Sequence, residues 1–327
     1  MPTRTMAAAM RDALDEEMAR DETVYVAGED VGEHGGTGGE TAGLLEKYGE
    51  ERVRDTPILE IGIAGHALGA AVAGLRPVVE LWFAEAAATA GDELVNQISK
   101  QPYVSGGRLR APLTIVAPSG GGVSGGAAHS QSVHAWTGHL SGIVVVTATT
   151  PYDAKGLLKS AIRDDNPVLF LPHKKLFDRE GDVPDEEYTL PLGEATVERD
   201  GGDVTVVATQ VMYHRAVEAA DELAGEADVE IVNPRTFAPI DTDTIVASVE
   251  KTGRLVVVDE TPLRYGTQGH VVSEVAERRF ERLVAPPRTV GVPDTPIPYS
   301  PVLEAEAIPS TDRIVDEIRQ VMAHSSV

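Results

Sequence analysis

Residues 57–81, PILEIGIAGHALGAAVAGLRPVVEL, contain both kinds of element that decide the fold. The first part, residues 57–75, consists largely of small and apolar residues and is typical of a helix. The second part, residues 77–81, is a short run rich in β-branched residues and is typical of a buried strand. A helix that leads directly into a buried strand is the repeating unit of α/β folds with mostly parallel sheets.

The same alternation extends in both directions from this stretch. Buried strands are predicted at residues 24–27, 77–81, 113–116, 142–146 and 168–171. Helices are predicted at residues 6–18, 57–75, 85–100 and 152–163. The first half of the chain is therefore expected to form an α/β domain in which helices cover a mostly parallel sheet.

A charged segment begins at residue 178, and its apolar residues follow neither the helical nor the strand spacing. We expect a linker there, at residues 178–193. It separates a first domain, residues 1–177, from a second, residues 194–327. In the second domain strands are predicted at residues 204–208, 229–232 and 255–258, and helices at residues 212–223, 241–250 and 268–282. A chain of 327 residues fits two α/β domains with helices on both sheet faces.

The composition excludes several classes of protein. The 52 acidic and 28 basic residues give a net charge of −24, which makes nucleic acid a poor partner. Such an acidic surface, with only seven lysines, suggests adaptation to a high-salt cytoplasm, the alternative being a moderately acidic mesophilic protein. No cysteine is present, which fits a reducing cytoplasm. The charged residues 1–18 do not resemble a signal peptide, and no apolar run is long enough to cross a membrane.

Two glycine clusters, residues 35–39 and 120–126, invite comparison with phosphate-binding loops. The phosphate-loop pattern ends in Gly-Lys-Ser/Thr, and the dinucleotide fingerprint needs a strand before it and a helix after it. Neither cluster meets these conditions. Flexible or tightly turning backbone is the simpler interpretation of both.

Glu60 is the first candidate for chemistry. Thr56 and Pro57 are suitable as a helix cap and first helical residue, and a capping acid would then stand at position 59 instead of 60. Small and apolar neighbours predict a poorly solvated carboxyl group with a raised pKa, suited to a proton-exchanging hydrogen bond with a ligand nitrogen. The alternative is an acid that merely meets the helix dipole.

His129 is the second candidate, because it stands between a glycine-rich loop and the polar residues 130–132. Backbone can approach a ligand closely there, and imidazole exchanges protons near neutral pH. A loop histidine bonded to backbone is the alternative. Ser130 and Ser132 lack the Gly-x-Ser-x-Gly elbow of serine hydrolases, and His134 and His139 lack the spacing and carboxylates of a zinc site.

Five motifs occur in this order along the chain: GEDVG (28–32), RDTPILE (54–60), GLRPVVE (74–80), HSQS (129–132) and TPYDAKGLL (150–158). Together they resemble one family, the beta subunit of the thiamine diphosphate-dependent decarboxylating component of 2-oxo acid dehydrogenase complexes, of the pyruvate, branched-chain and acetoin type. The similarity continues through residues 251–254 to 296–300 and covers nearly the whole chain.

The resemblance implies a pyrimidine-binding domain followed by a transketolase C-terminal-like domain. Glu60 would hydrogen-bond the pyrimidine ring of the cofactor, and His129 would aid proton transfer around substrate and lipoyl group. Glu29 and Asp92 match acidic positions that could line a proton path between paired sites, although solvated surface acids are an alternative. Family members also hold potassium; the matching positions are Leu113, Ala161, Ile162, Asp164 and Asn166.

The resemblance also implies partners. The superfamily holds magnesium and the diphosphate through a Gly-Asp-Gly motif, which this chain lacks, so an alpha subunit should supply both in an α2β2 heterotetramer. The second domain would dock a lipoyl-bearing acyltransferase core. The expected reaction is oxidative decarboxylation of a 2-oxo acid with acyl transfer to lipoamide. Acetoin cleavage, or a non-catalytic scaffold role suggested by Ala86 where the family often has an aromatic residue, are the alternatives.

Overall fold

The computed structural model describes residues 1–324, which form two compact units. The first unit comprises Met1–Ser119 and Thr137–Leu192, and the second comprises Gly120–Trp136 together with the chain from Gly193 onward. The sequence analysis placed residues 120–136 in the first domain, whereas in the structure this glycine-rich segment groups with the second unit. Its backbone is bonded there, as described below.

The first unit is built on a parallel sheet whose strands lie in the order β6-β7-β5-β4-β2-β3. Five of the strands were predicted to within two residues: β2 (Val24–Gly28), β4 (Arg76–Glu80), β5 (Thr114–Val116), β6 (Val144–Val146) and β7 (Val168–Phe170). The edge strand β3 (Val53–Asp55) was not predicted. The register of β2 and β4 places Gly28 beside Glu80, so both strands end at the same edge of the sheet.

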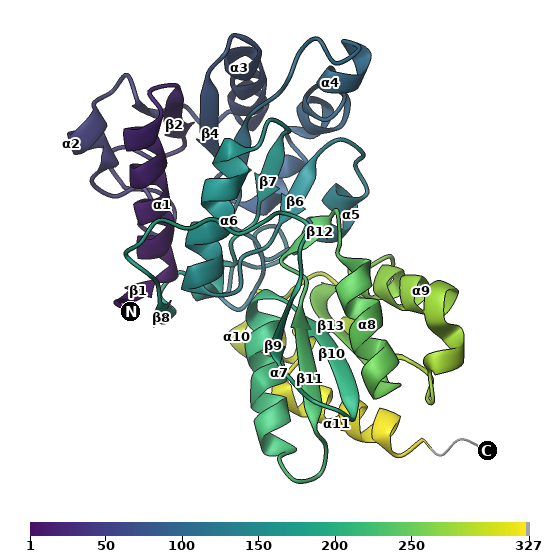
Figure 1. Cartoon of the computed structure of the whole chain (residues 1–327). Coiled ribbons are helices and arrows are strands. Elements are labelled where there is room, and N and C mark those ends of the chain that lie inside the picture. Colours follow the sequence, from purple (N-terminus) through teal and green to yellow (C-terminus); the bar gives the residue numbers. More distant parts are fainter. Residues whose placement is uncertain (325–327) are drawn as a thin grey trace. The chain divides into compact units, whose positions relative to one another are not determined.

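Two predicted helices of this unit, α1 (Met6–Arg20) and α6 (Pro151–Arg163), pack against each other (Figure 1). Their contact contains charged residues. Lys159 is fully buried and its ammonium lies 2.5 Å from Glu16 Oε2, while Arg163 Nη2 lies 2.6 Å from Oε1 of the buried Glu17. Buried charges are unfavourable unless they have partners of opposite charge. The acids of α1 and the bases of α6 provide these partners to each other.

The helix predicted at residues 57–75 begins three residues later, as α3 (Glu60–Val72). The N–H of Thr56 donates to Gly28 O at 2.8 Å, which prolongs the pairing of β3 with β2 and keeps the chain extended. Leu59 therefore precedes the first helical residue, and among the described residues the Thr56 hydroxyl has no hydrogen-bond partner. The predicted Thr56–Pro57 cap is wrong, and Glu60 is the first residue of the helix.

The single helix predicted at residues 85–100 is also wrong. The segment forms a 3₁₀ turn (Ala84–Ala87) and then a π-helix (Glu93–Ile98), and the short helix α4 (Gln101–Val104) follows. Gly91 lies between the first two, and glycine weakens a helix interior. Beyond it the hydrogen bonds follow a wider spacing, since the N–H of Ser99 donates to Leu94 O five residues back.

The predicted linker contains a strand. Within it β8 (Glu180–Asp182) pairs antiparallel with β1 (Thr3–Thr5) at the start of the chain. A short helix α2 (Leu44–Tyr48), a 3₁₀ turn (Lys174–Leu176) and helix α5 (His134–Gly138) were not predicted either. The domain limits given by the sequence stay a prediction.

The second unit is built on a sheet with the strand order β14-β13-β10-β11-β9, parallel except for β9. The predicted strands are present as β10 (Val204–Ala208), β11 (Val229–Asn233) and β13 (Leu255–Pro262), and β9 (Thr196–Arg199), β12 (Thr236–Ala238) and β14 (Arg288–Val292) are additional.

Helices of the second unit form two pairs on opposite sides of its sheet (Figure 1). Two of the predicted helices, α8 (Thr242–Thr252) and α9 (Thr267–Arg279), pack together and cover a core of valine, leucine and isoleucine side chains from three strands. A 3₁₀ turn (Phe280–Arg282) follows α9. The third predicted helix, α7 (Gln210–Glu222), packs with α11 (Thr311–Met322), which is preceded by α10 (Pro301–Ala307). Among residues 1–324 no helix is both long and apolar enough to cross a membrane.

Candidate active site

Glu60 stands at the amino end of α3, where its carboxyl group is half-buried. The apolar residues around it are exposed: Ile58 by 79%, Leu59 by 53% and Ile61 by 43%. The sequence predicted that these neighbours would bury Glu60, and within this chain alone they do not. The side chains of Ile58, Leu59 and Ile61 instead leave an apolar surface exposed at the amino end of α3.

Glu29 follows directly after β2 and is only 6% exposed. Among the described residues its Oε1 has no hydrogen-bond partner. Burial, and then the negative charges of Glu60 and Asp30, raise the pKa of the Glu29 carboxyl group. The charge of Glu60 thus contributes to the raised pKa of Glu29, an acid that the sequence matches to a position on a proton path.

Sequence reasoning missed a second acidic pair in this unit. Glu80 at the end of β4 and Glu40 after the first glycine cluster are 2% and 1% exposed, and the negative charge of Glu40 helps to raise the pKa of Glu80. The N–H and hydroxyl of Thr37 donate to Glu80 Oε1 at 3.1 and 3.0 Å, and the N–H of Gly38 donates to Glu40 Oε2 at 2.7 Å. Burial is the main cause that raises the pKa of both acids. The glycine cluster thus encloses two carboxyl groups from its own chain.

Two of the five positions proposed for potassium, Ile162 and Asp164, contact the side chain of Arg76. Its Nη1 donates to the carbonyl oxygens of Ile162 and Asp164 at 3.1 and 2.9 Å. The other predicted ligands are also engaged: Leu113 O accepts from Val168 N, Ala161 O from Asp164 N, and Asn166 Nδ2 donates to Asp164 Oδ1. Because a guanidinium already gives two of the carbonyls a positive partner, these residues do not need a bound cation to satisfy them, and potassium stays a prediction.

His129 lies on the second glycine-rich loop, residues 120–131, within the second unit. Its side chain is exposed, and its N–H donates to Gly126 O at 3.2 Å. The loop amides of Gly121, Gly122 and Ser124 donate to two buried carboxylates, one oxygen of Glu260 and both oxygens of Glu304. Like the first glycine cluster, this loop is occupied by carboxylates of the chain itself.

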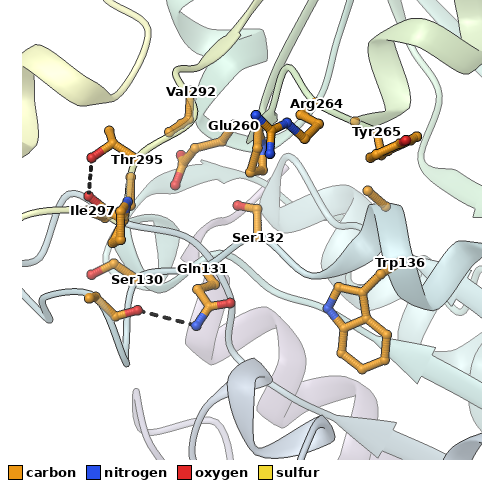
Figure 2. A pocket seen from close by; sticks show the side chains of 15 residues that line it. Ser130, Gln131, Ser132, Trp136, Glu260, Arg264, Tyr265, Val292, Thr295 and Ile297 are labelled. Carbon is orange, nitrogen blue, oxygen red and sulfur yellow. Dashed lines mark hydrogen bonds between the residues drawn. The ribbon is translucent and has the colours of Figure 1, made fainter.

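A cavity of about 480 Å³ adjoins this loop (Figure 2). Its walls are mostly apolar, with Trp136 and Tyr265 on the same side of the view in Figure 2. Ser130 and Ser132 also line it, and among residues 1–324 their buried hydroxyls have no hydrogen-bond partner. A mostly apolar cavity with a few polar groups is the usual form of a small-molecule site. The sequence offered no signal for it beyond the HSQS motif, because the opposite wall comes from residues 260–266 and 292–297.

His134 is buried beside this cavity and contacts Asp259, with 2.8 Å between Nε2 and Oδ2. It stacks on Phe237, and the hydroxyls of Thr261 and Thr267 donate to the same aspartate. Burial opposes the charge, yet the His134 imidazole and these hydroxyls hold the pKa of Asp259 below its usual value. Among residues 1–324 no cluster of three or more His, Cys, Asp or Glu side chains is placed to hold a metal ion.

Comparison with known proteins agrees with this architecture. Residues 3–179 match the transketolase pyrimidine binding domain, and residues 193–314 match the transketolase C-terminal domain. A solved structure described as a split gene transketolase, an inactive beta4 tetramer, has the same fold, with a TM-score of 0.79 over 97% of this chain and 98% of that one at 24% identity.

Two relatives are similar over almost their whole length. The pyruvate dehydrogenase E1 component subunit beta of Bacillus subtilis is 44% identical over 98% of this chain and 99% of the relative. The acetoin:2,6-dichlorophenolindophenol oxidoreductase subunit beta of Cupriavidus necator is 44% identical over 96% of both chains. With both transketolase-type domains present in order, the chain belongs to the family of beta subunits that includes those of pyruvate dehydrogenase E1 and of acetoin oxidoreductases.

Proposed function

We propose that the chain is the beta subunit of a pyruvate dehydrogenase-like 2-oxo acid dehydrogenase, which decarboxylates a 2-oxo acid on thiamine diphosphate and transfers the acyl group to lipoamide. The observation that carries this proposal is the order of the two matched domains, a pyrimidine binding domain followed by a transketolase C-terminal domain. The identity to the beta subunit of a pyruvate dehydrogenase supports the same assignment.

The residues around Glu60 fit the aminopyrimidine end of that cofactor. A half-buried carboxyl group can hydrogen-bond a ring nitrogen, and the exposed Ile58, Leu59 and Ile61 offer apolar surface. When bound, thiamine diphosphate supplies the nucleophilic carbon and accepts the electrons of the bond that breaks. Glu60 would hold and exchange the proton at the ring nitrogen, and the negative charge of Glu60 would help Glu29 keep its own proton.

His129 would exchange protons with the substrate and the lipoyl group, as the second catalytic residue. Its side chain is exposed on the surface of the second unit, so it is accessible to molecules that bind there. Imidazole exchanges protons near neutral pH, which suits this task. The backbone of its loop is held by two buried carboxylates, which reduces the freedom of the histidine.

An alpha subunit would complete the site. The chain has no Gly-Asp-Gly motif, so magnesium and the diphosphate would be held by the partner in an α2β2 heterotetramer. The exposed apolar residues 58, 59 and 61 are suited to burial against that partner. A lipoyl-bearing acyltransferase core, bound potassium and a cytoplasmic, high-salt setting belong to the same proposal.

Acetoin cleavage with the same cofactor is the second candidate. It is favoured by the relative from Cupriavidus necator, which has the same 44% identity as the pyruvate dehydrogenase subunit. Both candidates use Glu60 and His129 in the same roles, so these residues do not separate them. Substrate choice depends on side chains from the alpha subunit as well.

Co-expression of the chain with its alpha subunit, followed by purification of the assembly, provides the test. Turnover of pyruvate, branched-chain 2-oxo acids and acetoin would be measured with an artificial electron acceptor, with and without thiamine diphosphate. We expect turnover of a 2-oxo acid that requires the cofactor, and none in a Glu60→Gln variant that assembles normally. Equal turnover in the variant would favour a scaffold role, and turnover of acetoin alone would favour the second candidate.

A further inference from the structure

The carboxylate of Glu304 contacts the His129 loop, residues 120–131, at two points. Its Oε1 accepts the N–H of Gly122 at 2.8 Å, and its Oε2 accepts the N–H of Ser124 at 2.9 Å. Glu260 accepts the neighbouring N–H of Gly121. Both glutamates are almost fully buried, at 3% and 6% exposure, although they come from segments far away in sequence.

The conformation of the loop requires such an anchor. Ser124 has a φ of +57°, a left-handed conformation that side chains other than glycine rarely adopt. Strained residues of this kind persist only where surrounding contacts hold them. Here Glu304 bonds the N–H of Ser124 and lies 3.4 Å from its hydroxyl, so the strained residue is held by the glutamate itself.

The anchor reaches His129 through the backbone. Gly126 O accepts the N–H of His129, and the N–H of Gly120 donates to Gln131 O at 2.9 Å, which closes the base of the loop. A side chain on Gly125 would collide with His129 O, since an added Cβ would lie 2.5 Å from it. The loop therefore has little room to shift, and its apex is fixed by Glu304.

The surroundings of Glu304 indicate that this carboxylate is there for the loop. It stands in α10, where its neighbours Val302, Leu303 and Glu306 are all exposed. Burying a carboxylate is unfavourable unless hydrogen bonds compensate for it, and charge-assisted bonds to backbone N–H groups are among the stronger ones. Both of its oxygens accept hydrogen bonds from the loop.

We propose that Glu304 is a positioning residue for the reaction: it sets the place of His129 by fixing the apex of the loop, and Glu260 assists it. This inference rests on the proposed function, because it assumes that His129 takes part in turnover. Glu304 itself acts only through the histidine.

Two substitutions at position 304 test how many acceptor oxygens the loop needs. Glu304→Gln keeps one acceptor oxygen and turns an N–H donor toward the other loop amide, whereas Glu304→Ala removes both acceptors. Glu306→Gln is the matched control, because it makes the same change two residues away on the exposed side of α10. All variants are studied as the assembly with the alpha subunit.

Hydrogen–deuterium exchange of the peptide covering residues 120–131 tests the anchor without any assay of turnover. We expect faster exchange in Glu304→Gln, still faster exchange in Glu304→Ala, and wild-type exchange in Glu306→Gln. Exchange that is unchanged in both Glu304 variants would overturn the proposal.

Steady-state kinetics test the connection to His129. We expect Glu304→Gln to lower kcat by about tenfold or more while KM stays within about twofold, since small misplacements of a catalytic group cost rate. In a His129→Ala background the same substitution should change kcat by less than about twofold, because the residue that it positions is gone. Equal losses in both backgrounds would overturn the proposal and assign Glu304 a purely structural role.

The two experiments also separate this inference from the proposed function. A wild-type assembly that turns over neither 2-oxo acids nor acetoin would refute the proposed function, and with it the role of Glu304 in turnover. Unchanged exchange in an assembly that is active would refute the anchor alone.

Discussion

Glu80 and Glu40 accept hydrogen bonds from the consecutive amides of Thr37 and Gly38 inside the first unit, where the two acids are 2% and 1% exposed. Burial raises the pKa of both carboxyl groups, and the charge of Glu40 raises the pKa of Glu80 further. The folded state therefore binds protons at these two acids more tightly than an unfolded chain does.

Replacing Glu40 by glutamine should make the protein more stable above neutral pH. The raised pKa values mean that the folded state binds more protons than the unfolded state above the ordinary carboxyl pKa, so wild-type stability falls as pH rises there. A carboxamide can accept from Gly38 and donate to Glu80 without any proton. We expect the slope to decrease by up to about 1.4 kcal/mol per pH unit, measured by urea unfolding between pH 5 and 9. An unchanged slope would show that folding does not raise the pKa of these acids.

Glu29→Gln should stabilise the protein and impair turnover at the same time. The raised pKa of Glu29 means that its ionised form is disfavoured by folding, so the amide should add on the order of 1 kcal/mol at pH 8 and little below pH 4. Turnover with thiamine diphosphate should fall because the acid beside Glu60 is gone. The exposed Glu33, changed to glutamine, is the control and should alter neither property. A variant that gains stability and keeps full turnover would exclude Glu29 from the site.

Asp259→Asn should destabilise the second unit. The substitution removes the negative partner of the buried His134 and weakens the bonds from Thr261 and Thr267, at a cost of about 3 kcal/mol at pH 7. The pKa of Asp259 is lowered in the folded state, so its contribution is present above the unfolded pKa and is lost as pH falls through the folded value. The variant should therefore approach wild-type stability in acid. A constant difference across pH, seen by thermal unfolding, would contradict the lowered pKa of Asp259.

Salt should stabilise the protein because its net charge is −24. Added salt screens the repulsion between surface carboxylates as the Debye length falls from about 10 Å at 0.1 M to about 3 Å at 1 M. We expect the midpoint of thermal unfolding to rise between 0.1 and 2 M KCl, and a flat or falling midpoint would reject adaptation to high salt. An equal rise in NaCl is expected from screening alone. A larger rise in KCl than in NaCl would support potassium near Leu113 and Asp164.

The core strands were predictable because strands buried on both faces of a parallel sheet consist mostly of apolar and β-branched residues. Residues 24–27 and 204–208 carry that signal, and the structure has β2 and β10 there. The helix starts were less predictable. Thr56 and Pro57 are residues that commonly begin a helix, but a hydrogen bond from Thr56 to Gly28 on a neighbouring strand keeps the chain extended there. A competing contact of that kind leaves no trace in the residues around position 56.

The two catalytic candidates came from motifs, whereas the sequence did not connect the buried acids Glu304 and Glu80 with the residues near them. Glu304 lies 182 positions from Gly122, and Glu40 lies 40 positions from Glu80, so no local period connects either pair. One signal was present for Glu80, because an acid that ends an otherwise apolar buried strand needs a partner. Which residue provides that partner is decided by how the loop after β2 returns to the sheet.

The exposed side chains of Ile58, Leu59 and Ile61 have a consequence for how the cell must make this protein. Copies synthesised in excess of the alpha subunit would keep this apolar surface exposed to water, where it promotes self-association. Matched production of the two polypeptides would limit the amount of unassembled beta subunit, and chaperones or proteases would have to remove any surplus.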